Sequence, residues 1–209
     1  EKAFLAERKR FKKEHKKIAD LFKKMFDLRI KSANNAGYDN YRDFRFKELG
    51  IFDYTPDDCY GLHNSIKEYI LPIKKEIDAL RKNKLSVDSL RPWDMQVDIN
   101  QKEPLKPYAT IKELVDGVGK IFGDLKPLFG NNIKYLNDNG FFDLDSRKGK
   151  APGGYMMPLK ESGAAFIFMN GANQHQDVIT MLHEGGHAMH FLQSKQLKLK
   201  ENQMGPSEI

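Results

Sequence analysis

A His-Glu-Gly-Gly-His sequence at residues 183–187 is the feature that most constrains the fold of this chain. It lies in a stretch, about 177–196, where apolar residues recur every three or four positions, which predicts a helix with one buried face. On a helix, residues four apart share one face about a turn apart. The fold must therefore bury one side of this helix and leave the side that carries His183 and His187 accessible.

The spacing of these side chains predicts a zinc site. His183 and His187 can both direct a ring nitrogen to one ion, at the roughly 2.0–2.1 Å typical of Zn–N bonds. Glu184 is rotated off that axis, so it is expected to act as the base that takes a proton from a zinc-bound water. This is the arrangement of helical zinc peptidase motifs. The alternative is an amphipathic helix whose histidines are satisfied by neighbouring residues.

Two adjacent glycines, Gly185 and Gly186, sit inside this predicted helix. Each costs roughly 1 kcal/mol relative to Ala in a helix interior. Local preferences are usually broken where function or packing demands it. We therefore expect another backbone, a side chain or a substrate to approach the helix closely at these positions.

The remaining histidines and the cysteine are assigned lesser roles. His190 is expected to pack against or orient a neighbour, because one rigid helix cannot surround an ion with three ligands. His175 is a candidate for capping the helix or shaping the cleft. His15 and His63 lie in charged helical stretches and are predicted to be solvated. Cys59, the single cysteine, excludes an internal disulfide and a cysteine-rich zinc finger, and is interpreted as a small buried residue.

The net charge of +6 resides on one segment. Residues 1–31 contain twelve Lys and Arg against five Asp and Glu, whereas the other residues are close to neutral. Apolar residues recur at helical spacing between these charges, which predicts a helix over 2–32 with a core-facing stripe and a solvated basic face. No signature of nucleic-acid binding accompanies the charge, and no apolar run approaches the roughly 18 residues of a membrane helix.

Other local signals predict a mainly α fold with a small β element. Thr55-Pro56 and Thr110 mark helix starts. Helices are expected at about 40–50, 56–84 and 110–125, and a short one through 136. Prolines make 85–109 an irregular connector, with Leu90 and Trp93 as anchors. Strands at about 154–158 and 164–169 are expected to form a hairpin beside the 177–196 helix, where a strand edge could pair with an extended substrate.

With these residues in view, the chain resembles the oligoendopeptidase F and thimet oligopeptidase family of zinc metallopeptidases, and most of all its bacterial oligoendopeptidase F-like branch. The matching stretches are 40–44 (Asn-Tyr-Arg-Asp-Phe), 52–56, 90–94, 145–154, 166–170 and 183–190 (His-Glu-Gly-Gly-His-Ala-Met-His). The resemblance implies a helical, clam-like zincin-type oligopeptidase with a deep channel that cleaves short peptides internally. Residues 1–139 would form one wall of the channel, and 140–209 the start of the catalytic region.

The resemblance also implies that the metal site is incomplete in these 209 residues. The family's third zinc ligand is a Glu on the next helix, just beyond Ile209, and Glu208 is a slightly early candidate for it. We therefore expect the chain to be the N-terminal or central portion of a larger fold, completed by a second chain or a C-terminal fragment. Catalytic zinc needs three protein ligands, so residues 1–209 alone are predicted to bind zinc weakly and not to cleave peptides.

Three functions follow as hypotheses. The first is a zinc endopeptidase acting on short peptides, with His183 and His187 as ligands and Glu184 as base. The second is a zinc carboxypeptidase with the same motif. The third is a non-enzymatic module that binds an acidic partner through the basic first helix. The single cysteine and the lack of a signal-like segment favour the cytoplasm.

Overall fold

The computed structural model describes residues 1–100 and 102–203. It is mainly α-helical with one small sheet, as the sequence predicts. The chain forms two compact units, Glu1–Lys102 and Glu103–Ile209, and each is described by itself. No helix among the described residues is long and apolar enough to cross a membrane. Glu208 lies outside the described residues.

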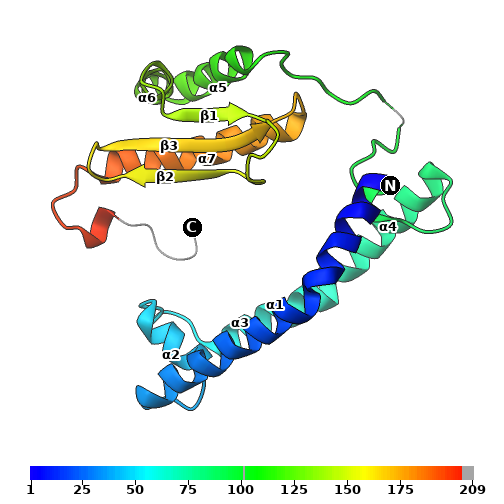
Figure 1. Ribbon diagram of the computed structural model, residues 1–209, viewed down its shortest axis with the longest axis vertical. Coiled ribbons are helices and arrows are strands. Elements are labelled where there is room, and N and C mark those ends of the chain that lie inside the picture. The colour runs from blue at the N-terminus through cyan, green and yellow to red at the C-terminus, as the bar shows by residue number, and fades with distance from the viewer. Residues whose placement is uncertain (101, 204–209) are drawn as a thin grey trace. The chain divides into compact units, whose positions relative to one another are not determined.

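The first unit is built from helices (Figure 1). Its elements are α1 (Lys2–Asn35), α2 (Tyr41–Glu48), α3 (Pro56–Ser65), a π-helical segment η1 (Ile66–Ile70), α4 (Leu71–Leu85) and a short 3-10 turn η2 (Pro92–Asp94). The side chains of Asn40 and Thr55 accept hydrogen bonds from backbone N–H groups at the starts of α2 and α3. These caps satisfy amides that have no partner inside a helix, which is why the helices begin there.

The helix predicted over 56–84 is continuous but passes through the π segment. Pro72 has no N–H and cannot make the α-helical bond to the carbonyl four residues back. The chain widens just before it, and the Leu71 amide bonds the Ile66 carbonyl five residues back. Between α4 and Thr110 the described residues are irregular apart from η2, as expected from the prolines. Trp93 anchors it through an edge-on contact with Phe4, at 5.6 Å between ring centroids.

The apolar stripe of α1 differs from the prediction. Its charged face is solvated, with ion pairs such as Arg10–Glu14 and Lys23–Asp27. The stripe expected to face a core is also exposed, including Phe11, Leu21 and Phe22. Among the described residues of this unit, Ala33 is the only buried hydrophobic residue. Cys59, interpreted as buried, is only partly buried.

The second unit combines helices with a three-stranded sheet. Its elements are α5 (Ile111–Leu125), α6 (Pro127–Asp138), β1 (Phe142–Asp145), β2 (Tyr155–Leu159), β3 (Ala164–Gly171), α7 (His175–Ser194) and a 3-10 turn η3 (Glu201–Gln203). The Thr110 hydroxyl caps α5 by accepting a hydrogen bond from the backbone N–H of Glu113. The Glu113 carboxylate accepts a hydrogen bond from the backbone N–H of Ala109. The expected boundary between 139 and 140 lies inside this unit, because α5 and α6 share a core with the sheet and α7.

The sheet has the strand order β1-β3-β2. β2 and β3 form the predicted antiparallel hairpin, with Tyr155 opposite Phe168 and Leu159 opposite Ala164. The four-residue strand β1 was not predicted, because it lies outside any alternating run long enough to signal a strand. It pairs with β3 in parallel, and its register shifts between Asp143 and Asp145. β3 is thus the central strand, and both of its edges are taken.

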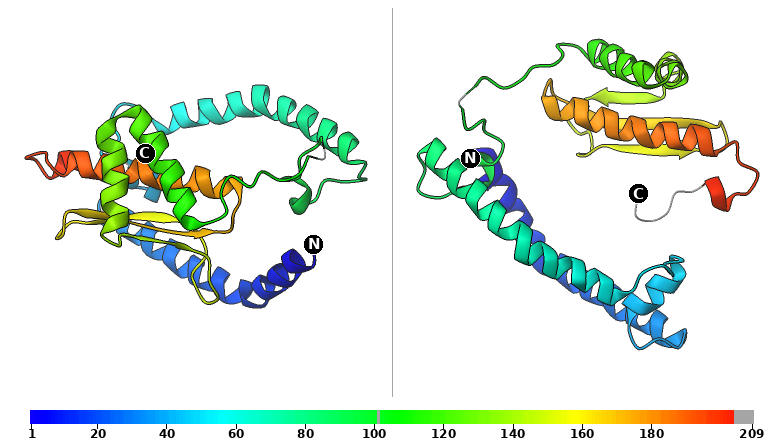
Figure 2. Two further views of the ribbon diagram at one scale, coloured as in Figure 1. Left: turned by 90° about the horizontal axis from the view of Figure 1, so that it is seen from above. Right: turned by 180° about the vertical axis from the view of Figure 1, so that it is seen from behind.

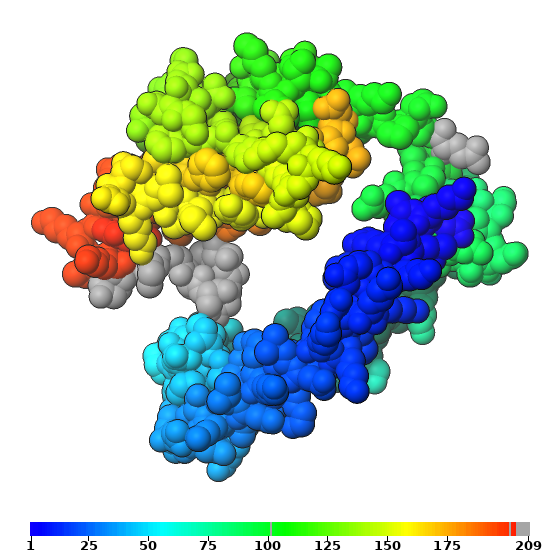
Figure 3. All heavy atoms as spheres, viewed as in Figure 1, coloured from blue at the N-terminus to red at the C-terminus, as the bar shows by residue number. Residues whose placement is uncertain are grey.

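The core lies on one side of the sheet. The side chains of Ala165, Ile167 and Met169, at alternate positions of β3, are buried on the face that packs on α7. Helix α7 runs behind β3 and β2 in Figure 1 and in front of them in the view from behind (Figure 2). The opposite face of the strands forms the surface seen in Figure 3. Helix α7 packs on β3 and β2 and also contacts α5 and α6. These contacts bury one face of α7, whereas the face that carries His183 remains exposed.

Candidate metal centre

The start of α7 is fixed by a buried hydrogen-bond cluster. Asp177 Oδ2 accepts from the backbone N–H groups of Ala172 and Gln174, both at 2.8 Å, and from the Tyr108 hydroxyl. The Asn173 amide in turn donates to the Tyr108 oxygen at 3.0 Å. A carboxylate in the first turn also suits the positive end of the helix dipole. These bonds hold the helix to the segment that precedes α5.

His183 and His187 converge as the spacing predicts. Their Nε2 atoms lie 3.1 Å apart, and the two rings are nearly perpendicular, at 89°. Two nitrogens bound to one tetrahedral ion at about 2.0–2.1 Å would be separated by about 3.3 Å. The pair therefore fits zinc in its donor atoms and in their separation. Among the described residues no group of three or more His, Cys, Asp or Glu could hold a metal.

Glu184 lies between the two histidines in sequence but points elsewhere. The residue is buried, with 8% of its surface exposed. No hydrogen bond or ion pair engages its carboxylate within the described residues, and no side-chain oxygen there is both fully buried and unsatisfied. Its oxygens therefore keep access to water. A carboxylate without a competing partner is suited to take up a proton.

The two glycines of the motif have different surroundings. A Cβ on Gly185 would lie 2.7 and 2.9 Å from ring atoms of Phe122, so α5 can pack on α7 only because this residue has no side chain. Gly186 is exposed, and a Cβ there would meet nothing within 4 Å. The expectation of a close approach is confirmed for Gly185, by a side chain. Gly186 lies instead on the face of α7 that carries His183 and His187, which we call the histidine face.

The histidine face lines a shallow hollow of about 360 Å³, formed by Leu182, His183, Gly186, His187 and His190. His190 thus lies on the same face, one turn beyond His187. His175 is exposed at the first position of α7, and His15 and His63 are exposed as predicted. The hollow is open and bounded by α7 alone, so a ligand there would be held on one side by this helix.

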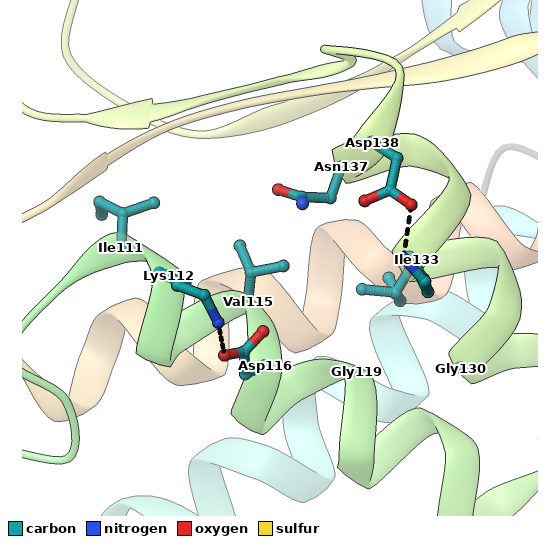
Figure 4. A pocket seen from close by; sticks show the side chains of 10 residues that line it. Ile111, Lys112, Val115, Asp116, Gly119, Gly130, Ile133, Asn137 and Asp138 are labelled. Atoms are coloured by element: carbon teal, nitrogen blue, oxygen red, sulfur yellow. Dashed lines mark hydrogen bonds and ion pairs between the residues drawn. The ribbon is translucent and has the colours of Figure 1, made fainter.

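A larger hollow of about 620 Å³ lies between α5 and α6 (Figure 4). Its floor is apolar, with Val115 and Ile133, and glycines bring the two helices together at one end. The charged groups at its rim are paired with one another, Lys112 with Asp116 and Lys134 with Asp138. It contains none of the predicted site residues.

The sequence signals did not reveal two polar clusters in this unit. One is the Tyr108–Asp177 pair at the start of α7, whose partners are 69 positions apart. The other surrounds Lys150, which lies in the stretch 145–154 that carries part of the family resemblance. An acid in the first turn of a predicted helix could have suggested the role of Asp177, but local patterns do not show its distant partner.

Comparisons with known proteins find similar sequences and similar folds. The model of Peptidase family M3 matches residues 1–203. Group B oligopeptidase PepB of Streptococcus agalactiae serotype III (strain NEM316) is 23% identical over 81% of this chain and 28% of its own length. Oligopeptidase PepF of Bacillus subtilis (strain 168) is 29% identical over 65% of this chain and 20% of its own length. The structure of PZ peptidase A with an inhibitor superposes with a TM-score of 0.86 at 23% identity, over 95% of this chain and 35% of its own. The chain thus spans about a third or less of these relatives.

Proposed function

Because the chain belongs to Peptidase family M3, we propose that the complete protein is a zinc-dependent endopeptidase acting on short peptides. Relatives named oligopeptidases support peptides as the substrate class. The observation that carries the proposal is the pair of Nε2 atoms 3.1 Å apart on an open helix face, with a buried carboxylate between them in sequence.

His183 and His187 would hold the metal through Nε2. Zinc bound there would lower the pKa of a water and polarise a peptide carbonyl. Glu184 would accept a proton from the water and deliver it to the nitrogen of the departing amine. Its side chain suits this role because it is held in a packed helix and its oxygens still reach solvent. The third ligand would come from outside the described residues, from Glu208 or a position beyond Ile209 on the same or a second chain.

The edge strand β2 would bind the peptide backbone. Of the two strands of the predicted hairpin, β3 has neighbours on both sides, so only β2 has a free edge for a peptide. Of the two edge strands, β2 is the one that packs on α7. An extended peptide could add to β2 by main-chain hydrogen bonds and lie alongside the turns that carry the histidines.

The proposal is tested with the complete protein. Zinc content is measured after purification, and internally quenched peptides with blocked and free C-termini are offered with and without a chelator. We expect one zinc per site, chelator-sensitive cleavage, and equal cleavage of both peptides at internal bonds. Release of single C-terminal residues from the free peptide alone would indicate the carboxypeptidase. Stoichiometric zinc without cleavage of either peptide would contradict the proposal.

A further inference from the structure

A buried lysine lies on the sheet face opposite α7. Lys150, on the segment between β1 and β2, has only 1% of its side chain exposed. Its Nζ donates to the carbonyls of Met169 at 2.6 Å, Asp145 at 2.7 Å and Asp143 at 2.9 Å, and to Asp143 Oδ1 at 3.0 Å. It also lies 4.4 Å from the centre of the Phe168 ring. A charged group so deeply buried is tolerated only because it is fully hydrogen-bonded.

The irregularity between β1 and β3 explains these bonds. The pairing register shifts between Asp143 and Asp145, which interrupts the regular ladder. The Lys150 ammonium bonds carbonyls on both strands at this point. The Asp143 carboxylate also accepts two hydrogen bonds from Arg147. These bonds, and to a lesser degree the one from Lys150, hold the pKa of the Asp143 carboxyl far below its ordinary value. The segment that follows β1 is therefore tied to the end of β3.

A second side chain holds the same segment further along. The Asn170 amide nitrogen donates to the carbonyl of Ala151 at 2.9 Å and to that of Gly153 at 3.0 Å. Asn170 is near the end of β3, four residues before the cap of α7. Lys150 and Asn170 thus fix residues 150–153 from one end of the central strand. We call these two residues the loop clamp.

The residue that follows the clamped segment 150–153 contacts α7. A Cβ on Gly154 would lie 2.9 Å from Thr180 Cγ2, so the backbone just before β2 touches α7 one turn ahead of His183. After β2, the Lys195 ammonium beyond the end of α7 donates to the Gly163 carbonyl. β2 is therefore anchored to α7 at both ends, and the turns with His183 and His187 lie between the anchors.

We propose that Lys150 and Asn170 are positioning residues that set the place of β2 relative to α7, and so choose which bond of a β2-paired peptide reaches Glu184. This inference rests on the proposed function. Neither side chain touches the metal site. If residues 150–154 were free to move, a peptide paired with β2 would shift along or away from α7 while the metal ligands stayed in place.

The test compares Asn170→Ala with Asn139→Ala in the complete protein. The Asn139 amide also donates to a backbone carbonyl, that of Tyr135 at 2.8 Å, but at the end of α6. For Asn170→Ala we expect a KM about five- to tenfold higher from the loss of two modest hydrogen bonds, with kcat and zinc content unchanged. Mass spectrometry should show added products cut at neighbouring bonds. Lys150→Met should act in the same direction, and Asn139→Ala should match wild type.

The outcomes separate this inference from the proposed function. If wild type cleaves the peptide and Asn170→Ala gives the KM and products of Asn139→Ala, the loop clamp has no positioning role and the peptidase stands. Binding of the same peptide is also measured by fluorescence in Glu184→Gln protein, with and without Asn170→Ala. If no protein cleaves, but Asn170→Ala still weakens this binding about five- to tenfold, the positioning role stands and the peptidase fails.

Discussion

The two units of this chain differ in what they bury. In the described part of the second unit, fifteen hydrophobic residues from α5, α6, α7 and the sheet form one core together with Tyr108. In the described part of the first unit, Ala33 alone is buried, although apolar residues recur at helical spacing along α1 and α4 too. Apolar spacing therefore reports which face of a helix is apolar, and the partner that covers it must come from elsewhere. The candidate chemistry lies in the unit that has its own core.

A core of this kind matters for the site because it holds the helix backbone rigidly. Met181, Ala188 and Met189 are buried along one face of α7. A site needs its supporting shell to keep side chains within small tolerances. The described part of the first unit, by contrast, has solvated charges and exposed apolar side chains, and it buries no comparable core.

The largest contrast is expected in activity. In the complete protein, Glu184→Gln should lower kcat about 10²- to 10⁴-fold, because the amide cannot accept the proton, and zinc content should be retained. Lys16→Gln on the solvated face of α1 should leave kcat within about twofold of wild type. Both are measured with a quenched peptide. Equal losses in the two variants would remove the distinction between the units.

A smaller contrast is expected in stability. Ile133→Ala in the core of the second unit, where the side chain is 1% exposed, should cost about 2–5 kcal/mol. Ile77→Ala on α4, 55% exposed, should stay within about 0.5 kcal/mol in the 209-residue chain. Urea unfolding followed by circular dichroism gives both values. A cost for Ile77→Ala as large as that of Ile133→Ala would show that α4 is covered.

The same contrast between buried and exposed positions is expected at two adjacent residues of α7. Gly185→Ala should destabilise the second unit by about 1–3 kcal/mol, because the new methyl group would overlap Phe122. Gly186→Ala, facing open space, should be neutral or stabilise by up to about 1 kcal/mol through helix propensity. Thermal unfolding of the 209-residue chain measures both. A loss of stability in Gly186→Ala equal to that in Gly185→Ala would contradict the assignment.

The last expected effect, a pH dependence, is confined to alkaline solution. Burial, and then the hydrogen bond to Asp177, raise the pKa of Tyr108 to about 12, from an ordinary value of 10.0. The unfolded chain ionises this tyrosine first as pH rises, so its contribution is complete below pH 10 and is lost toward pH 12. The loss should be on the order of 2 kcal/mol. Tyr108→Phe should lower stability at neutral pH and remove this part of the alkaline slope.

The local parts of the fold were predictable. Caps at Thr55 and Thr110, the hairpin of β2 and β3, and α7 all follow from signals within a few residues of the elements themselves. Strand β1 was missed because four residues carry too little periodicity, and its parallel pairing depends on a strand more than twenty residues away. The exposure of the α1 stripe was missed because periodicity does not identify a partner.

The sequence by itself determined the arrangement on α7, because helix geometry places residues 183, 184 and 187 relative to one another without help from the rest of the chain. Only the tertiary structure decided what surrounds them. It made β3 a central strand, placed Phe122 against Gly185 but nothing against Gly186, and bonded the buried Lys150 to carbonyls of two strands. These outcomes depend on contacts between residues far apart in the chain, and such contacts leave no local pattern in the sequence.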